Sequence, residues 1–327
     1  MGTIKKNFVY NLVLTLSNII FPIITFPYAS RILGPEGIGK VQFVNTFAVY
    51  FVLIAALGIP IYGIREVAKR QKEPEALRKL FTELLTLNFV TSILLLAIYT
   101  VIVYFSPALY ADRDFYAVAA VMILLGCFNI DWLFSGLERF RFIAARSVII
   151  KGASIFVLFF LVRNHDDDIY YLAITVGGIV MNNAWNMWSA RKYFDFKLLV
   201  IREIKQHLKP LIYIFSSVAA ISVYVLLDTI ILGFLTDFQA VGYYTSASRI
   251  IKITIPVLTS LGTVLIPQMA TAFKEKNMDH VQDLAMHSMS FVISLGVPMC
   301  IGLIVLAPEL IMLFSGAAFA ASIFPMQ

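Results

Sequence analysis

Long stretches without charge most constrain how this chain folds. The residues from Phe8 to Ser30 contain no Asp, Glu, Lys or Arg, and neither do those from Leu84 to Ala111. About 20 such residues in a helix cross the ~30 Å of hydrocarbon in a bilayer, because each residue adds about 1.5 Å. In lipid every backbone group needs an internal partner, which favours helices. The sequence therefore predicts an all-α, polytopic transmembrane helix bundle.

The composition agrees with this fold class. Of the 327 residues, 60% are apolar and 14% are charged, whereas soluble domains carry about 25% charge. The net charge of +6 is not interpreted as nucleic-acid binding, because the positions of the charges decide their meaning. Cys127 and Cys300 lie within apolar stretches, where cysteine behaves as a small hydrophobic residue. We therefore expect no disulfide, no metal site and no cofactor.

The apolar stretches predict nine complete spans. No cleavable signal peptide is expected, because the first stretch has full span length and lacks a small-residue cleavage site. Residues 317–327 look like the start of a tenth span, so we expect the chain to be truncated at its C-terminus. The predicted spans are residues 8–29, 42–63, 82–106, 116–136, 147–162, 169–190, 211–235, 243–272 and 288–307.

The distribution of lysine and arginine predicts the orientation. With the N-terminus and its Lys5 and Lys6 inside, the inner segments hold 20 of these residues and the outer segments hold four. Such an excess marks the cytoplasmic side, so we expect a multi-pass protein of the cytoplasmic (inner) membrane with its N-terminus in the cytoplasm. The inner segments 64–81 and 191–209 carry mixed charge and are expected to lie as amphipathic helices on the cytoplasmic surface.

An internal repeat appears at a spacing of about 203 residues. It predicts two parallel lobes around a central cavity, with residues 1–200 forming a six-helix lobe with its connector and 201–327 starting a second. Lobes of this kind rock to give alternating access. Prolines at 22, 27, 60, 256, 267 and 298 would kink the moving helices. The matching pairs are Gly37-Ile38-Gly39 with Ala240-Val241-Gly242, Leu57-Gly58 and Pro60 with Leu261-Gly262 and Pro267, and Pro107-Ala108-Leu109 with Pro308-Glu309-Leu310.

Two motifs could suggest other chemistry. The residues from Gly34 to Lys40 match most of a phosphate-binding loop, but Val41 stands where Ser or Thr must hold Mg²⁺. A tight outer turn, with glycines at positive φ, explains this segment better. The acidic triplet 166–168 could hold a metal diphosphate, but its short loop favours solvated charge. No catalytic or metal-ligand spacing is found, so a transporter is favoured over an enzyme.

Ionisable residues inside the spans are the most informative, because each costs several kcal/mol unless it is paired or hydrated. Asp131, Asp228, Arg249 and Lys252 are of this kind. Arg249 and Lys252 lie three residues apart, on one helix face, and either snorkel to the outer interface or face the cavity. The repeat aligns Arg249 with Thr46, inside the second span, which favours the cavity. Asp228 is the expected ion-pair partner of the two cations.

Two segments carry a family resemblance. The residues from Phe26 to Gly39, FPYASRILGPEGIG, and those from Asp131 to Phe140, DWLFSGLERF, resemble the Wzx-type flippases of polysaccharide repeat units. These flippases belong to the multidrug/oligosaccharidyl-lipid/polysaccharide exporter (MOP) superfamily and usually have twelve or more helices in two lobes.

The resemblance implies a substrate, an oligosaccharide on a polyprenyl pyrophosphate that is moved from the inner to the outer leaflet. It also implies membrane lipids and a polysaccharide polymerase as partners. Arg31, Arg249 and Lys252 would then attract the pyrophosphate, since arginine and lysine suit phosphate. The sugar would meet polar side chains of the cavity, which also suit hydrogen bonds between helices: Asn129, Asn182, Asn183 and Gln268.

Two other functions stay open at this point. A cation-coupled multidrug antiporter of the same fold would want more intramembrane carboxylates than two. A membrane glycosyltransferase or polymerase would need a catalytic loop that the short connections do not provide.

The topology predicts where reporter fusions will be active. Because cytoplasmic and outer segments alternate, one inverted site would contradict the helix assignment and the repeat together. An alkaline phosphatase and β-galactosidase fusion pair at each site provides the measurement. We expect cytoplasmic signals after Arg78, Lys151, Lys205 and Lys276, and external signals after Gly37, Asp112, Asp167 and Asp237.

Overall fold

The computed structural model describes the backbone of residues 2–327, and all their side chains except those of 2–5, 8, 201, 257, 260–264, 266 and 267. Lys5 and the repeat residues Leu261, Gly262 and Pro267 thus lie outside the described side chains. No strand occurs in the described chain. The α-helices are α1 (Gly2–Ala56), α2 (Ile59–Lys69), α3 (Pro74–Phe105), α4 (Pro107–Tyr110), α5 (Arg113–Leu124), α6 (Asp131–Gly136), α7 (Phe140–Leu161), α8 (Asp168–Ala190), α9 (Ile201–Leu235), α10 (Phe238–Lys274), α11 (Met278–Val305), α12 (Ala307–Phe314) and α13 (Ile323–Met326). Four 3₁₀ helices complete the described elements: η1 (Leu125–Phe128), η2 (Arg191–Tyr193), η3 (Phe196–Leu198) and η4 (Ala317–Ser322).

The predicted fold class is confirmed. Among the described residues, six helical segments are long and apolar enough to cross a membrane, and the first, Val9–Lys69, contains two of the predicted spans. The predicted spans 169–190 and 243–272 lie in α8 and α10. The chain is therefore a multi-pass helical membrane protein.

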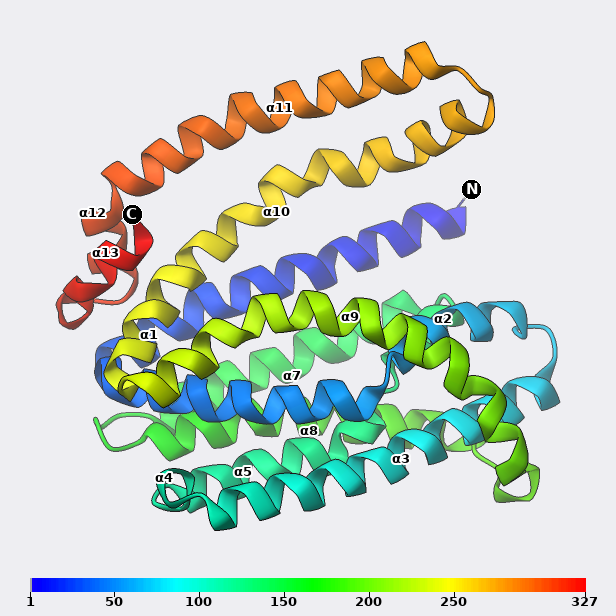
Figure 1. The fold of residues 1–327 in the computed structure, drawn as a ribbon, viewed down its shortest axis with the longest axis horizontal. Helices are drawn as coiled ribbons and strands as arrows, with labels where there is room; N and C mark the ends of the chain where they lie inside the picture. The colour runs from blue at the N-terminus through cyan, green and yellow to red at the C-terminus, as the bar shows by residue number, and fades with distance from the viewer. Residues whose placement is uncertain (1) are drawn as a thin grey trace.

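The outer turn of α1 is tighter than expected. The segment from residue 30 to residue 41 is helical on both sides of Gly34, which alone leaves the helical region, with φ 67°. Residues 2–33 form the first arm of α1 and residues 35–56 form its second arm, and Figure 1 shows the chain reversing direction between them. Positive φ at Gly34 fits the expected glycine turn, whereas Gly37 and Gly39 have ordinary φ and serve close packing.

The predicted fourth span, 116–136, is not one continuous helix. It is divided into α5, η1 and α6, with Asn129 and Ile130 between the last two. Backbone carbonyls at the break are bonded by other helices: Asn88 donates to Cys127 and Asn183 donates to Leu125. The indole of Trp132 lies against Gly63, so this part of the second family motif packs α6 onto α2.

The expected surface helices are only partly correct. Segment 64–81 is helical in α2 and in the start of α3, but residues 70–73 separate the two. In segment 191–209, η2 and η3 precede the continuous helix α9, which begins at Ile201. The C-terminal residues 317–327 form η4 and α13, two short helices rather than a straight start of a tenth span.

A buried polar triad attaches α9 to the helices of the first lobe. His207 of α9 bonds Tyr62 Oη through Nδ1 at 2.7 Å and Glu83 Oε2 through Nε2 at 2.9 Å. All three side chains are buried. Farther along α9, most of its apolar surface is exposed. The triad and Leu211 therefore attach α9 near its N-terminal end.

The second arm of α1 crosses α10 at two glycines that the repeat relates to each other. A Cβ atom at Gly39 would overlap the carbonyl oxygen of Phe238, and one at Gly242 would overlap that of Pro35. Because positions 35 and 39 correspond to 238 and 242, this contact is reciprocal, as a two-fold relation requires. It supports the predicted repeat, while the lobe boundary at residue 200 stays a prediction.

The crossing predicts that alanine substitutions at its two glycines differ in effect from one at a glycine elsewhere. Gly39→Ala or Gly242→Ala must separate two backbones, and overpacking of this kind costs about 1–3 kcal/mol. Gly302→Ala on α11, where a Cβ atom meets nothing within 4 Å, should be neutral or stabilise by about 0.5–1 kcal/mol. Thermal unfolding of the purified protein in detergent measures this difference. Equal melting temperatures for all three variants would contradict the close approach.

Candidate functional site

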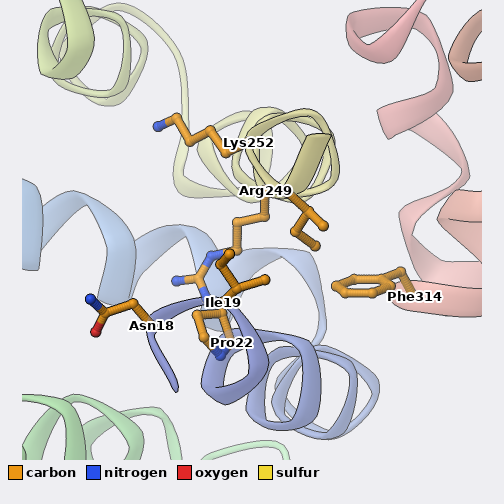
Figure 2. A pocket seen from close by; sticks show the side chains of 7 residues that line it. Asn18, Ile19, Pro22, Arg249, Lys252 and Phe314 are labelled. Carbon is orange, nitrogen blue, oxygen red and sulfur yellow. The ribbon is translucent and has the colours of Figure 1, made fainter. Parts of the chain in front are cut away.

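A pocket between α1 and α10 brings two of the predicted cations together. It has a volume of about 290 Å³ and contains Arg249 and Lys252 of α10. Figure 2 shows Arg249 directed from α10 towards Ile19 and Pro22 of the first arm of α1. Asn18, Ile253 and Phe314 complete the lining. Both cations line this pocket, although Figure 2 shows the side chain of Lys252 directed away from Arg249, and their role in a substrate pathway stays a prediction.

Neutral groups alone hold the guanidinium of Arg249. Its Nη2 donates to Gln42 Oε1 at 3.2 Å, and Gln42 Nε2 donates in turn to Thr46 Oγ1 at 3.0 Å. The guanidinium carbon lies 4.5 Å from the ring centre of Phe26, within the range of a cation–π contact. The repeat partner Thr46 thus belongs to the same hydrogen-bonded chain as Arg249.

Asp228 is not the counter-ion of these cations, which corrects the expected ion pair. Its Oδ2 accepts a hydrogen bond of 2.6 Å from the hydroxyl of Tyr244. Among the described residues, no carboxylate lies within ion-pair distance of Arg249 or Lys252. Tyr244, which lies nearer the N-terminal end of α10 than Arg249 does, is therefore the partner of this carboxylate.

Arg31 lies apart from the pocket lining. Its Nη2 donates to the carbonyl of Leu313 at 2.5 Å, near the C-terminal end of α12. Cations are favourable at this end of a helix, where carbonyls lack helical partners. Arg31 thus joins α1 to α12, and the structure does not group it with Arg249 and Lys252.

Asp131 belongs to a separate buried cluster that includes an arginine. Arg146 of α7 is 2% exposed, and its Nη2 donates to Asp131 Oδ1 at 2.6 Å. Its Nε donates to Asn182 at 3.0 Å, and Asn186 donates to the same Asp131 oxygen at 3.0 Å. From the sequence, Arg146 was expected in an inner segment. The carboxylate of Asp131, fifteen residues earlier within a predicted span, was the signal that a cation had to lie nearby.

The polar residues expected to meet sugar have divided roles. Asn182 and Asn183 bond other helices, which is their interhelical alternative. Asn129 and Gln268 are exposed. No contact in the structure groups these four residues at one site.

The sequence analysis also missed Lys151 of α7. Its ammonium group donates to Ser17 Oγ at 3.1 Å and to Asn18 Oδ1. No carboxylate of the described residues forms an ion pair with it. Asn18 lines the pocket of Arg249 and Lys252, so three cations without acidic partners surround one part of α1. The charge-free residues that follow Lys151 in the predicted span were the signal that it lies within the membrane.

Two residues of the acidic triplet 166–168, Asp167 and Asp168, serve the local structure. Asp167 Oδ2 accepts hydrogen bonds from the backbone nitrogens of Arg163 and Asn164 at 2.8 and 2.7 Å, and these bonds lower the pKa of Asp167. Burial raises the pKa of Asp168, which packs against Gly37. In the part of the chain that the structure describes, no group of three or more potential ligands could hold a metal ion.

A comparison with protein families assigns the chain. The family model described as "Polysaccharide biosynthesis protein" matches residues 4–273. The chain belongs to this family. Together with the curated relatives described next, this family confirms the resemblance to the Wzx-type polysaccharide flippases.

Curated relatives and solved structures agree with this family. A putative O-antigen transporter of Shigella dysenteriae is 23% identical over 320 residues, which cover 97% of this chain and 79% of that protein. A putative O-antigen transporter of Escherichia coli K12 is 24% identical, over 82% of this chain and 65% of that protein. The fold is similar to a multidrug resistance MATE family transporter of the MOP superfamily in an inward-facing conformation, with a TM-score of 0.64 and 14% identity over 93% of this chain and 75% of that one. It is also similar to MATE in complex with MaL6, with a TM-score of 0.54 and 16% identity over 94% of this chain and 79% of that one.

The pairing of Asp131 and Arg146 predicts a specific pattern of stability. Removing one partner of a buried ion pair costs about 3–5 kcal/mol, and the partial exposure of Asp131 places Asp131→Ala at the lower end. The double variant Asp131→Ala, Arg146→Met should regain stability, because it leaves no unpaired charge. Asp166→Ala, in the exposed loop, serves as the control. The measurement is the melting temperature of each variant in detergent. A double variant less stable than Asp131→Ala would refute the pairing.

Proposed function

We propose that the protein moves lipid-linked oligosaccharide repeat units across the cytoplasmic membrane by alternating access. The substrate class is an oligosaccharide on a polyprenyl pyrophosphate. Family membership and the names of the two curated relatives support a polysaccharide transporter. The observation that carries the substrate class is the pocket in which Arg249 and Lys252 have no acidic partner among the described residues.

The position of the cations supports handling of a buried anion. Arg249 and Lys252 follow the start of α10 at Phe238 by 11 and 14 residues, or about 16 and 21 Å at about 1.5 Å per residue. In a layer of about 30 Å this depth is near the middle. An interface-snorkelling arginine needs no such depth, so the pocket hypothesis is favoured. A pyrophosphate brings the negative charge that the pocket lacks.

The alternative functions have less support. A multidrug antiporter of this fold would carry cationic compounds, which the uncompensated Arg249 and Lys252 would repel. A membrane glycosyltransferase or polymerase is disfavoured because both curated relatives are named as transporters. The excess of lysine and arginine in the segments on the N-terminal side of the predicted spans supports a cytoplasmic N-terminus.

Removal of the pocket cations tests the proposal in the full chain. Each charge-assisted hydrogen bond to phosphate contributes about 1.5–3 kcal/mol, so Arg249→Ala should abolish export of the surface polysaccharide without lowering the amount of protein in the membrane. Arg249→Lys should keep part of the activity, because it keeps the charge. Lys274→Ala, at the far end of α10, should export normally. Normal export from Arg249→Ala, Lys252→Ala would end the assignment of the pyrophosphate to α10.

A further inference from the structure

A second cavity lies on the other side of the first arm of α1. It is a groove of about 400 Å³ between α1 and α7. Its walls are apolar except for Ser17 and Lys151. The α1 wall comprises Val13, Leu16, Ser17, Ile20 and Phe21, and the α7 wall comprises Val148, Lys151, Gly152 and Ile155.

The groove and the pocket occupy opposite faces of one helix. Groove residues Leu16, Ser17 and Ile20 follow the spacing of one helix face, and pocket residues Asn18 and Pro22 follow that of the opposite face. Asn18 also accepts the hydrogen bond of Lys151. Lys151 therefore stands within one side chain of the pocket that contains Arg249 and Lys252.

The chemistry of the groove indicates an amphiphilic anion. Apolar walls bind a hydrocarbon chain, and Lys151 offers an ammonium group whose partners are two neutral oxygens. An anionic headgroup would supply the charge that this lysine lacks. Because Asn18 links Lys151 to the pocket of Arg249 and Lys252, the amphiphile expected in the groove is the one whose headgroup that pocket is proposed to bind.

We propose that this groove binds the isoprenoid chain of a lipid pyrophosphate, with Lys151 contacting the pyrophosphate. The inference rests on the proposed function and adds a site for the lipid part of the substrate. The chain stays in apolar surroundings while its headgroup meets Lys151. Only the α1 turn from Ser17 to Pro22 separates this headgroup position from Arg249 and Lys252.

Gly152 allows the groove to be filled without altering the fold. A Cβ atom at Gly152 meets nothing within 4 Å, and the same holds for Gly177 on α8, which is absent from the groove lining. Gly152→Phe and Gly177→Phe are thus matched variants, one in the groove and one outside it. Gly152→Leu provides a second groove variant should the phenylalanine variant fail to accumulate.

The experiment measures binding of labelled farnesyl pyrophosphate to the full chain in phosphatidylcholine nanodiscs. We expect Gly152→Phe to weaken binding at least about tenfold, because several methylene groups lose their apolar contacts. Gly177→Phe should bind as the unmodified chain does. Lys151→Gln should weaken the binding of farnesyl pyrophosphate by about tenfold, because one charge-assisted hydrogen bond is lost. The binding of farnesol, which has no pyrophosphate, should not change.

Inorganic pyrophosphate separates this proposal from the proposed function. It lacks a chain, so its binding should be lost in Arg249→Ala, Lys252→Ala and kept in Gly152→Phe. If Arg249→Ala, Lys252→Ala still binds inorganic pyrophosphate while Gly152→Phe still weakens the binding of farnesyl pyrophosphate, only the proposed function is overturned. Unchanged farnesyl pyrophosphate binding in both Gly152 variants would overturn the groove site. Displacement by phosphatidylglycerol at equal concentration would also overturn it, since the site would then bind bulk anionic lipid.

Discussion

The backbone contact between Gly39 and Gly242 determines where the charged residues of this protein can meet. Because neither residue has a Cβ atom, the second arm of α1 and the start of α10 approach more closely than side chains would allow. Gln42 follows Gly39 by one turn, and Arg249 follows Gly242 by two. A helix is stiff over such distances, so the crossing places the amide of Gln42 within reach of the guanidinium. The close approach and the positive pocket are therefore parts of one arrangement.

The intramembrane cations have two different environments. Arg146 is buried, but the carboxylate of Asp131 compensates its charge, and the neutral amide of Asn182 adds a further hydrogen bond. Lys151 and Arg249 instead bond neutral oxygens, which orient a cation without cancelling its charge. An uncompensated charge in apolar surroundings is costly, and such residues usually mark the path of a substrate or ion. The difference between these environments distinguishes a structural arginine from cations that are available to an anion.

The sequence predicts the parts of this structure that depend on local patterns. Charge-free stretches give the spans because unpaired backbone groups are excluded from lipid. The glycines of segment 34–40 predict a turn, and within α1 Gly34 is the residue that leaves the helical region, with positive φ. The break after α5 was missed because its carbonyls are bonded by Asn88 and Asn183, which are distant in the sequence.

The candidate site shows the same limit. The spacing of Arg249 and Lys252 grouped them on one helix face, and both line one pocket, while their function there stays a prediction. The partners of Arg31 and Asp228 were not predictable in this way, since a helix-end carbonyl of Leu313 and the hydroxyl of Tyr244 leave no charge signal.

Pro22 weakens α1 between the pocket and the groove. It lacks the N–H that would bond the carbonyl of Asn18, so the hydrogen-bond ladder of α1 is weakened in the turn between pocket and groove. A helix bends readily at such a proline. Pro22 is therefore a weakened point of α1 between Lys151 and Arg249, the two groups proposed to contact the lipid pyrophosphate.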